Sequence, residues 1–173
     1  SPVHITSDWR GQPPTLPARI AVAERRGNDL RPVALIDPAA VLRLRSYVWP
    51  DQAARAARLQ GAIALARRDL PRVDGGDAAA WVERELAAPR AGVATVLLHS
   101  IVWQYLPGAT RERIEAAVAA AAQRATQAAP LAWLRMEFFA KDAPAELRLT
   151  LWPEGRERTL ARSHPHGEWV EWL

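Results

Sequence analysis

The 173-residue chain contains no cysteine. A disulfide framework and a thiolate zinc site are therefore excluded, and so is thiol chemistry. No apolar run reaches the roughly 18 residues that a membrane-spanning helix needs. The glycine-rich loops that cradle phosphates, Gly-x-Gly-x-x-Gly and the Walker loop, are also missing. A chain of this length can still bury a core. Because its first stretch is typical of neither a signal nor a transit peptide, we expect a single cytoplasmic domain over residues 1–173.

Lysine is nearly absent, since Lys141 is the only lysine among 23 basic residues. An excess of arginine together with 35 alanines is typical of high-GC coding, so the net charge of +4 is a weak argument for a nucleic-acid partner. The arginines are scattered in ones and twos, and no block of five like charges occurs. This distribution indicates a solvated surface, and we expect neither a nucleic-acid nor a membrane partner.

Short apolar runs alternate with helical patterns over the first four-fifths of the chain. Strands are expected at 20–23, 72–74, 93–99 and 131–139, and helices at 37–49, 51–70, 77–88 and 110–129, with Asp51, Asp77 and Thr110 as N-caps. The run at 93–99 is continuously apolar rather than alternating. Such a run is typical of a strand that is buried on both faces, as in a parallel sheet covered by helices.

The alternation of strands and helices stops after residue 139. Residues 146–152 alternate polar with apolar side chains, and Pro153-Glu154-Gly155 has turn chemistry. Further strands at 158–162 and 169–172 complete an antiparallel meander. The whole pattern predicts a three-layer, Rossmann-like α/β fold, with a mostly parallel sheet, helices on both faces and antiparallel C-terminal strands.

Ligands in such sheets bind beyond the carboxyl ends of the strands. Asp29 follows the first expected strand, where a carboxylate can accept both hydroxyls of a ribose; alternatively, Asn28 and Asp29 bond their own backbone in a turn. Asp77 and Ala78 follow the second strand. They can contact an exocyclic amine and a ring nitrogen, and the alternative is a plain helix N-cap.

The most apolar strand ends in His99 and Ser100, with Tyr105 shortly after. These side chains are well placed for substrate chemistry; the alternative is that His99 bonds a backbone carbonyl and the aromatic residues belong to the core. A Ser–His nucleophile pair is disfavoured, because adjacent strand residues point to opposite faces and no Gly-x-Ser-x-Gly elbow exists. His164 and His166 lack a third ligand, so no metal site is expected.

Three stretches resemble the motifs of class I S-adenosylmethionine-dependent methyltransferases, in the same order along residues 20–129. They are similar to that family's second-, third- and fourth-strand motifs: Gly27-x-Asp29-Leu30-x-Pro32-x-x-Leu35, Gly76-Asp77-Ala78, and residues 96–107, which end in Leu106-Pro107. The resemblance implies that Asp29 binds the ribose of S-adenosylmethionine. It also implies that Asp77 and Ala78 contact the adenine, and that His99, Ser100 and Tyr105 face the methyl acceptor.

The whole chain resembles the C-terminal half of a bacterial family, domain-of-unknown-function family 2332. The resemblance lies in five stretches of the sequence: Ser1-Pro2-Val3, Glu24-Arg25-Arg26-Gly27-x-Asp29-Leu30, residues 42–52, residues 99–107 and His166-Gly167-x-Trp169-Val170-Glu171-Trp172-Leu173. That family looks like a methyltransferase fold with a helical N-terminal region and a glycine-rich first-strand loop.

The resemblance implies that this chain is a piece without the first strand, inactive by itself. Two arrangements would cover the open sheet edge, a homodimer contact or a rearranged strand order. The rival hypothesis is a non-catalytic binding module that kept the scaffold, since a fold does not determine a function.

Overall fold

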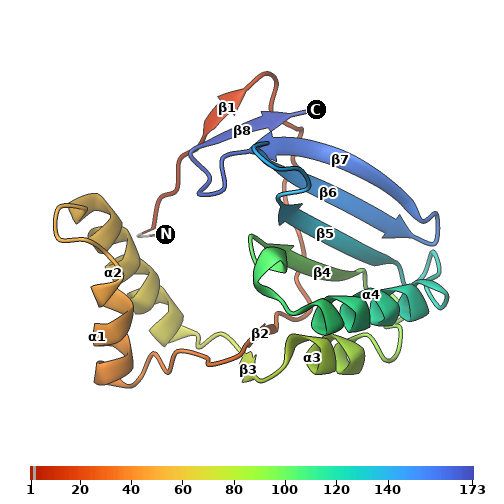
Figure 1. The fold of residues 1–173 in the computed structure, drawn as a ribbon, viewed down its shortest axis with the longest axis horizontal. Helices are drawn as coiled ribbons and strands as arrows, with labels where there is room; N and C mark the ends of the chain where they lie inside the picture. Colours follow the sequence, from red (N-terminus) through yellow and green to blue (C-terminus); the bar gives the residue numbers. More distant parts are fainter. Residues whose placement is uncertain (2) are drawn as a thin grey trace. The chain divides into compact units, whose positions relative to one another are not determined.

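A computed structural model describes residue 1 and residues 3–173, which form two compact units (Figure 1). Unit 1 comprises Ser1–Ile5 and Glu24–Asp77, and unit 2 comprises Thr6–Ala23 and Ala78–Leu173. Each unit has its own sheet: a two-stranded one in unit 1 and a six-stranded one in unit 2.

Unit 1 contains a short parallel strand pair and two helices. Strand β2 (Gly27–Asp29) pairs with β3 (Val73–Gly75). Helix α1 (Pro38–Ser46) begins at a capping aspartate, Asp37, whose side chain accepts a hydrogen bond of 2.9 Å from the Ala39 amide. Helix α2 (Ala53–Arg68) is rich in alanine, the strongest helix former. Both helices confirm the prediction, but Asp51 does not cap α2, because the residue before this helix is Gln52.

The sheet of unit 2 has the strand order β1-β8-β7-β6-β5-β4, and its pairing is mixed. The strands are β1 (Asp8–Arg10), β4 (Thr95–Ser100), β5 (Leu131–Glu137), β6 (Ala145–Trp152), β7 (Arg156–Ser163) and β8 (Trp169–Trp172). Parallel pairs form only at the two edges, β4 with β5 and β1 with β8. The other pairs are antiparallel, since the β5–β6 and β6–β7 connections are too short for a crossover. The predicted C-terminal meander is confirmed.

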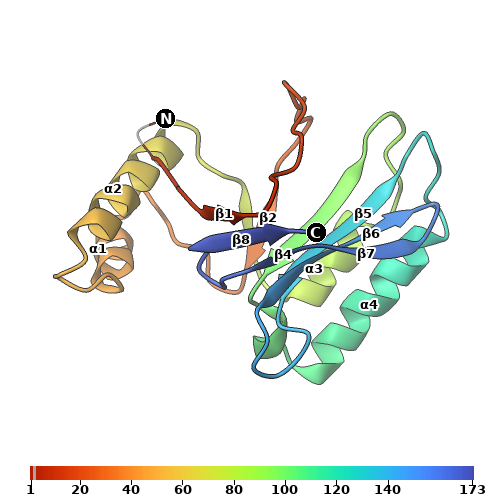
Figure 2. The same ribbon diagram turned by 90° about the horizontal axis from the view of Figure 1, so that it is seen from above.

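Helices α3 (Ala78–Glu85) and α4 (Gly108–Ala122) pack against each other and against one face of this sheet (Figure 2). Helix α4 begins after Pro107, so Thr110 lies inside it and is not its cap. Apolar residues at helical spacing on α4 meet alternate residues of β5. The buried cluster that results contains Ala79, Val82, Leu86, Ile114, Val118, Ala121, Leu131 and Trp133.

The prediction of a three-layer, mostly parallel Rossmann-like fold is wrong. The expected strand at 20–23 is irregular, because a run of four apolar residues found no partner strand. The strands β2 and β3 pair only with each other. Strand β4 is an edge strand that is covered on one face only: Val96 is 55% and Leu98 62% exposed, and burial alternates along the strand. Continuous apolar composition therefore did not mean burial on both faces.

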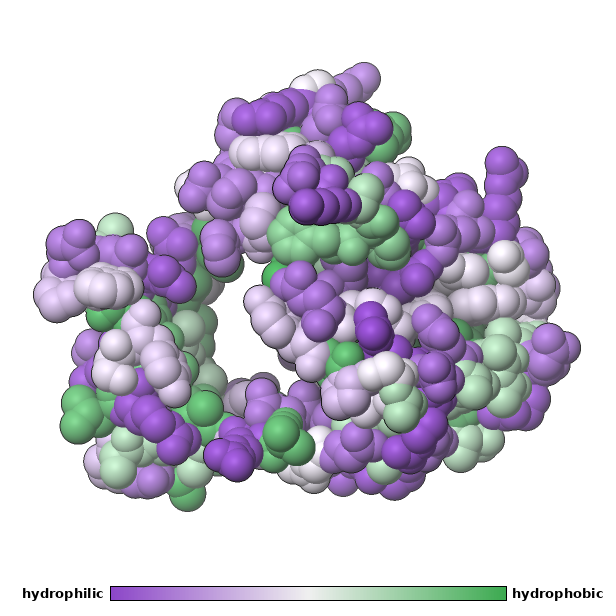
Figure 3. Space-filling view, in the orientation of Figure 1, coloured by the Kyte–Doolittle hydropathy of each residue, from purple (hydrophilic) through white to green (hydrophobic). Residues whose placement is uncertain are grey.

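Apolar side chains reach the surface in several separate patches (Figure 3). The exposed large hydrophobic residues include Leu16 and Ile20, in the irregular segment that follows β1. No helix in the described part of the chain is both long and apolar enough to cross a membrane.

Two leucines on neighbouring strands test the one-sided packing of the sheet. Leu131→Ala empties a position in the buried cluster and should lower the free energy of unfolding by about 2–5 kcal/mol. Leu98→Ala, on the opposite and exposed face, should change it by less than about 0.5 kcal/mol. Urea unfolding followed by tryptophan fluorescence measures both, and equal losses would contradict a core on one face only.

Candidate functional site

Strand β4 ends in a strained turn. Ile101 directly follows the strand and has a φ of +48°, which is a genuine outlier for a β-branched residue. Two hydrogen bonds to acceptors on strand β5 hold the backbone around it. The Ile101 amide donates to the Met136 carbonyl at 2.9 Å, and the Val102 amide donates to Glu137 Oε1 at 3.1 Å. Strain of this kind persists where the surroundings fix it, and such residues cluster at functional sites.

The acid that holds this turn is buried. Glu137, the last residue of β5, is only 3% exposed, and its Oε1 lies 2.7 Å from His99 Nδ1. The parallel register pairs His99 with Arg135, so Glu137 lies two residues further along on the same face of the sheet. One carboxylate oxygen therefore joins the histidine at the end of β4 to the turn that follows it.

Two tryptophans enclose the histidine. Trp103 begins the short 3₁₀ helix η1 (Trp103–Tyr105) and stacks on the His99 ring, with centroids 5.2 Å apart and planes at 17°. The Trp133 ring lies 6.0 Å from the His99 ring and 5.9 Å from that of Trp103. His99 Nε2 and Trp133 Nε1 are both buried and form no hydrogen bond within the described structure. A buried acceptor or donor without a partner needs a physical explanation.

The surroundings keep this histidine neutral. Burial lowers the pKa of His99 below its usual range, and Arg135 adds to this effect, whereas the hydrogen bond and the charge of Glu137 act in the opposite direction. Since the folded state holds the proton less tightly than the unfolded chain, this group's contribution to stability is present above the ordinary histidine pKa of about 6.5. It is lost as the pH falls below that value toward the lowered pKa of the folded state. At neutral pH the ring therefore has one unprotonated nitrogen that can accept a proton.

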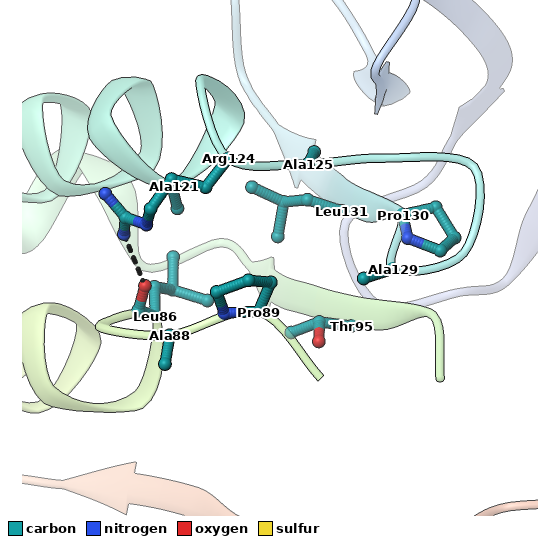
Figure 4. Close-up of a pocket in the computed structure, with 10 residues that line it drawn as sticks. All are labelled: Leu86, Ala88, Pro89, Thr95, Ala121, Arg124, Ala125, Ala129, Pro130 and Leu131. Carbon is teal, nitrogen blue, oxygen red and sulfur yellow. Dashed lines mark hydrogen bonds between the residues drawn. The ribbon is translucent and has the colours of Figure 1, made fainter. Parts of the chain in front are cut away.

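Two hollows lie near β4. An open one of about 380 Å³ borders Trp103 at the start of α4, and it is lined by Trp103, Gly108, Arg111, Glu112 and Glu115. A second, of about 290 Å³, lies at Thr95, the opposite end of β4 from His99 (Figure 4). It is mostly apolar, and its one charged residue, Arg124, donates to the Leu86 carbonyl at 2.9 Å. The first hollow includes Trp103, which stacks on His99, although His99 itself does not line it.

Of the predicted residues in unit 2, the structure places only His99 in this cluster. Ser100 is exposed and points to the opposite face of the sheet, and Tyr105 is 73% exposed. The alternative that His99 bonds a backbone carbonyl is wrong, because its partner is Glu137. Sequence reasoning missed Glu137. Yet the rule that selected Asp29 and Asp77, an acid at the carboxyl end of a strand, also applies to this residue.

The predicted residues of unit 1 lie at the carboxyl end of the parallel pair. The Gly76 amide donates to the Asp29 carbonyl at 3.1 Å, and Asp77 directly follows Gly76. Asp29 Oδ1 accepts from the Arg31 amide at 2.7 Å, so the local-turn interpretation of this residue is confirmed. Ala78 is the first residue of α3, in unit 2.

The second carboxylate oxygen of Asp29, Oδ2, forms no hydrogen bond within the described residues, and the side chain is exposed. A carboxylate oxygen of this kind is the acceptor that a ribose hydroxyl needs. The chemistry of unit 1 therefore fits the ribose of a nucleoside. In the described part of the chain, no three histidine or acidic residues lie close enough together to hold a metal.

Two substitutions at Ile101 test the strained turn. At ordinary positions glycine is about 0.5–1 kcal/mol less stable than alanine. At a left-handed position the order reverses, and Ile101→Gly should be about 1 kcal/mol more stable than Ile101→Ala. The neighbouring Val102, at a φ of −120°, is the control, because at that position the alanine variant should be more stable than the glycine variant. Chemical denaturation of the four variants gives the comparison, and the same order at both positions would contradict the strain.

The sequence pattern of one bacterial protein family matches residues 1–172, nearly the whole chain. This match confirms the family resemblance but says nothing about methyltransferases. A search of curated proteins and a search of solved structures each gave no match. The chain belongs to the family described as "Uncharacterized protein conserved in bacteria (DUF2332)".

Proposed function

We propose that this chain is part of an S-adenosylmethionine-dependent methyltransferase, in which His99 accepts the proton of the methyl acceptor. The observation that carries the proposal is the buried pair of His99 and Glu137, 2.7 Å apart at the carboxyl end of β4. The order of the three methyltransferase-like motifs supports it at the level of sequence only, because β2 and β3 lie in a different sheet from β4.

Unit 1 would bind the nucleoside half of the cofactor. Asp29 Oδ2 would accept the ribose hydroxyls, while Oδ1 keeps its bond to the Arg31 amide. Asp77 would contact the adenine, as the resemblance implies; the same role for Ala78, which belongs to unit 2, stays a prediction. Bound S-adenosylmethionine supplies an activated methyl group, so the protein has to align an acceptor and take its proton.

The histidine is suited to the second of these tasks. It is neutral, because burial lowers the pKa of His99. The rings of Trp103 and Trp133 restrict water, and hydrogen bonds inside such an environment are strengthened. A substrate would approach from the hollow beside Trp103. Ser100 and Tyr105 lie outside the cluster, and their contact with the acceptor stays a prediction.

The second candidate is a non-catalytic binding module. The observation that favours it is the use of Asp29 inside its own turn, where the carboxylate has a structural task without any ligand. Under this hypothesis unit 1 binds no nucleoside, so the two candidates differ in whether the protein binds S-adenosylhomocysteine.

Calorimetric titration of the full-length protein with S-adenosylhomocysteine separates them. Asp29→Asn keeps Oδ1 for the Arg31 amide but replaces the oxygen that would accept ribose hydroxyls. Loss of charge-assisted hydrogen bonds worth about 1.5–3 kcal/mol should weaken Kd by about 10- to 100-fold. Asp51→Asn, an exposed aspartate in the turn before α2, is the matched control and should leave Kd unchanged.

Absence of heat from the unsubstituted full-length protein would contradict the methyltransferase proposal and favour the binding module. Equal weakening by Asp29→Asn and Asp51→Asn would show that the ligand responds to overall charge, and this would contradict the assigned ribose contact.

A further inference from the structure

We infer that Glu137 is the positioning residue of this site: its Oε1 fixes the proton of His99 on Nδ1 and thereby leaves Nε2 as the atom that accepts a proton from substrate. The inference deepens the proposed function and rests on it for the identity of the reaction. The hydrogen-bond arrangement stands on the geometry of the site alone.

The amide of Val102 can only donate, and it donates to Glu137 Oε1 at 3.1 Å. An ionised carboxylate can only accept. His99 Nδ1, which faces the same oxygen at 2.7 Å, therefore supplies the hydrogen of that contact when Glu137 is ionised. In a neutral imidazole only one nitrogen carries a proton, so Nε2 holds the lone pair.

Packing does not account for an acid at this position. A buried carboxylate is unfavourable unless it is hydrogen-bonded, and an apolar side chain would fill the same space at the edge of the aromatic cluster. Glu137 bonds both the histidine and the turn at Ile101, whose left-handed backbone is itself unfavourable. The carboxylate thus fixes the ring and the segment that carries Trp103 at the same time.

The free lone pair narrows the substrate class. An acceptor that loses a proton to Nε2 has to carry a transferable proton, as a hydroxyl, a thiol or an amine does, whereas a carboxylate or a thioether has none to give at neutral pH. Trp133 Nε1 is a second buried group without a partner in the same cluster, and it can only donate. The substrate class is therefore an alcohol, a phenol, a thiol or an amine.

The experiment is ¹⁵N NMR of the histidine side chains, recorded between pH 4 and pH 9. In the unsubstituted chain the neutral His99 ring should show a protonated Nδ1 and an unprotonated Nε2. The charged groups that face His99 are Glu137 and Arg135, both from β5, and the other rings of the cluster do not titrate.

Glu137→Gln provides the decisive comparison. A glutamine oxygen can still accept from Nδ1 and from the Val102 amide, so the tautomer should persist. Because the negative charge that raises the pKa of His99 is gone, that pKa should shift further down. An unchanged titration would show that the charge of Glu137 does not act on the His99 ring in solution. Glu171→Gln is the control: this acid on β8 lies near Arg162, three strands away from β5, and its replacement should leave the pKa of His99 unchanged.

A proton on Nε2 of neutral His99 in the unsubstituted chain would overturn the inference, and this measurement needs no variant to fold. An identical His99 titration in Glu137→Gln and the unsubstituted chain would overturn it as well. The tautomer is measured without cofactor. A chain with the expected tautomer that binds no S-adenosylhomocysteine would therefore refute the proposed function and leave the positioning role standing.

Discussion

One buried carboxylate organises the end of strand β4. Glu137 lies in the interior of unit 2, and an acid in such a place is stable only when donors surround it. The donors come from two segments that the chain brings together through the parallel pairing of β4 with β5: the ring of His99 and the amide of Val102. The turn at Ile101 can hold its unfavourable conformation because this bond and the bond to the Met136 carbonyl fix it from one side.

The site lies where the apolar core gives way to a charged layer on the same face of the sheet. Trp133 belongs to the buried cluster under α3 and α4, and the guanidinium of Arg135 lies 4.3 Å from the centre of its ring. Further out, Arg148 lies 3.7 Å from the ring centre of Phe139, and Glu157 pairs with both arginines. His99 is therefore desolvated from one side and exposed to positive charge from the other, which explains why the direction of its pKa shift is downward despite the acid beside it.

The parts of the fold that the sequence predicted correctly were those set by local patterns. The alternation of Glu146-Leu147-Arg148-Leu149 and the short turn at Pro153 specify an antiparallel hairpin by themselves. The overall architecture depends on which strands find partners, and composition does not decide this. The apolar residues of β4 suit a central strand and an edge strand equally well, so Val96 and Leu98 were wrongly placed in a covered layer. His99 was selected because it lies at the carboxyl end of a strand, and the chain offers few such positions. Glu137 was missed because its partner is 38 residues away.

This distance along the chain also distinguishes the two sets of candidate residues. The bond of Asp29 Oδ1 joins residues two positions apart, and a turn of this kind explains the aspartate without any ligand. The contact between His99 and Glu137 is non-local, it buries a charged group, and it leaves Nε2 of the ring without a donor. A turn cannot account for such an arrangement, and a buried ring nitrogen without a partner needs an explanation of its own. Function is therefore better supported by the residues of unit 2, where a contact between distant parts of the chain buries a carboxylate beside a histidine.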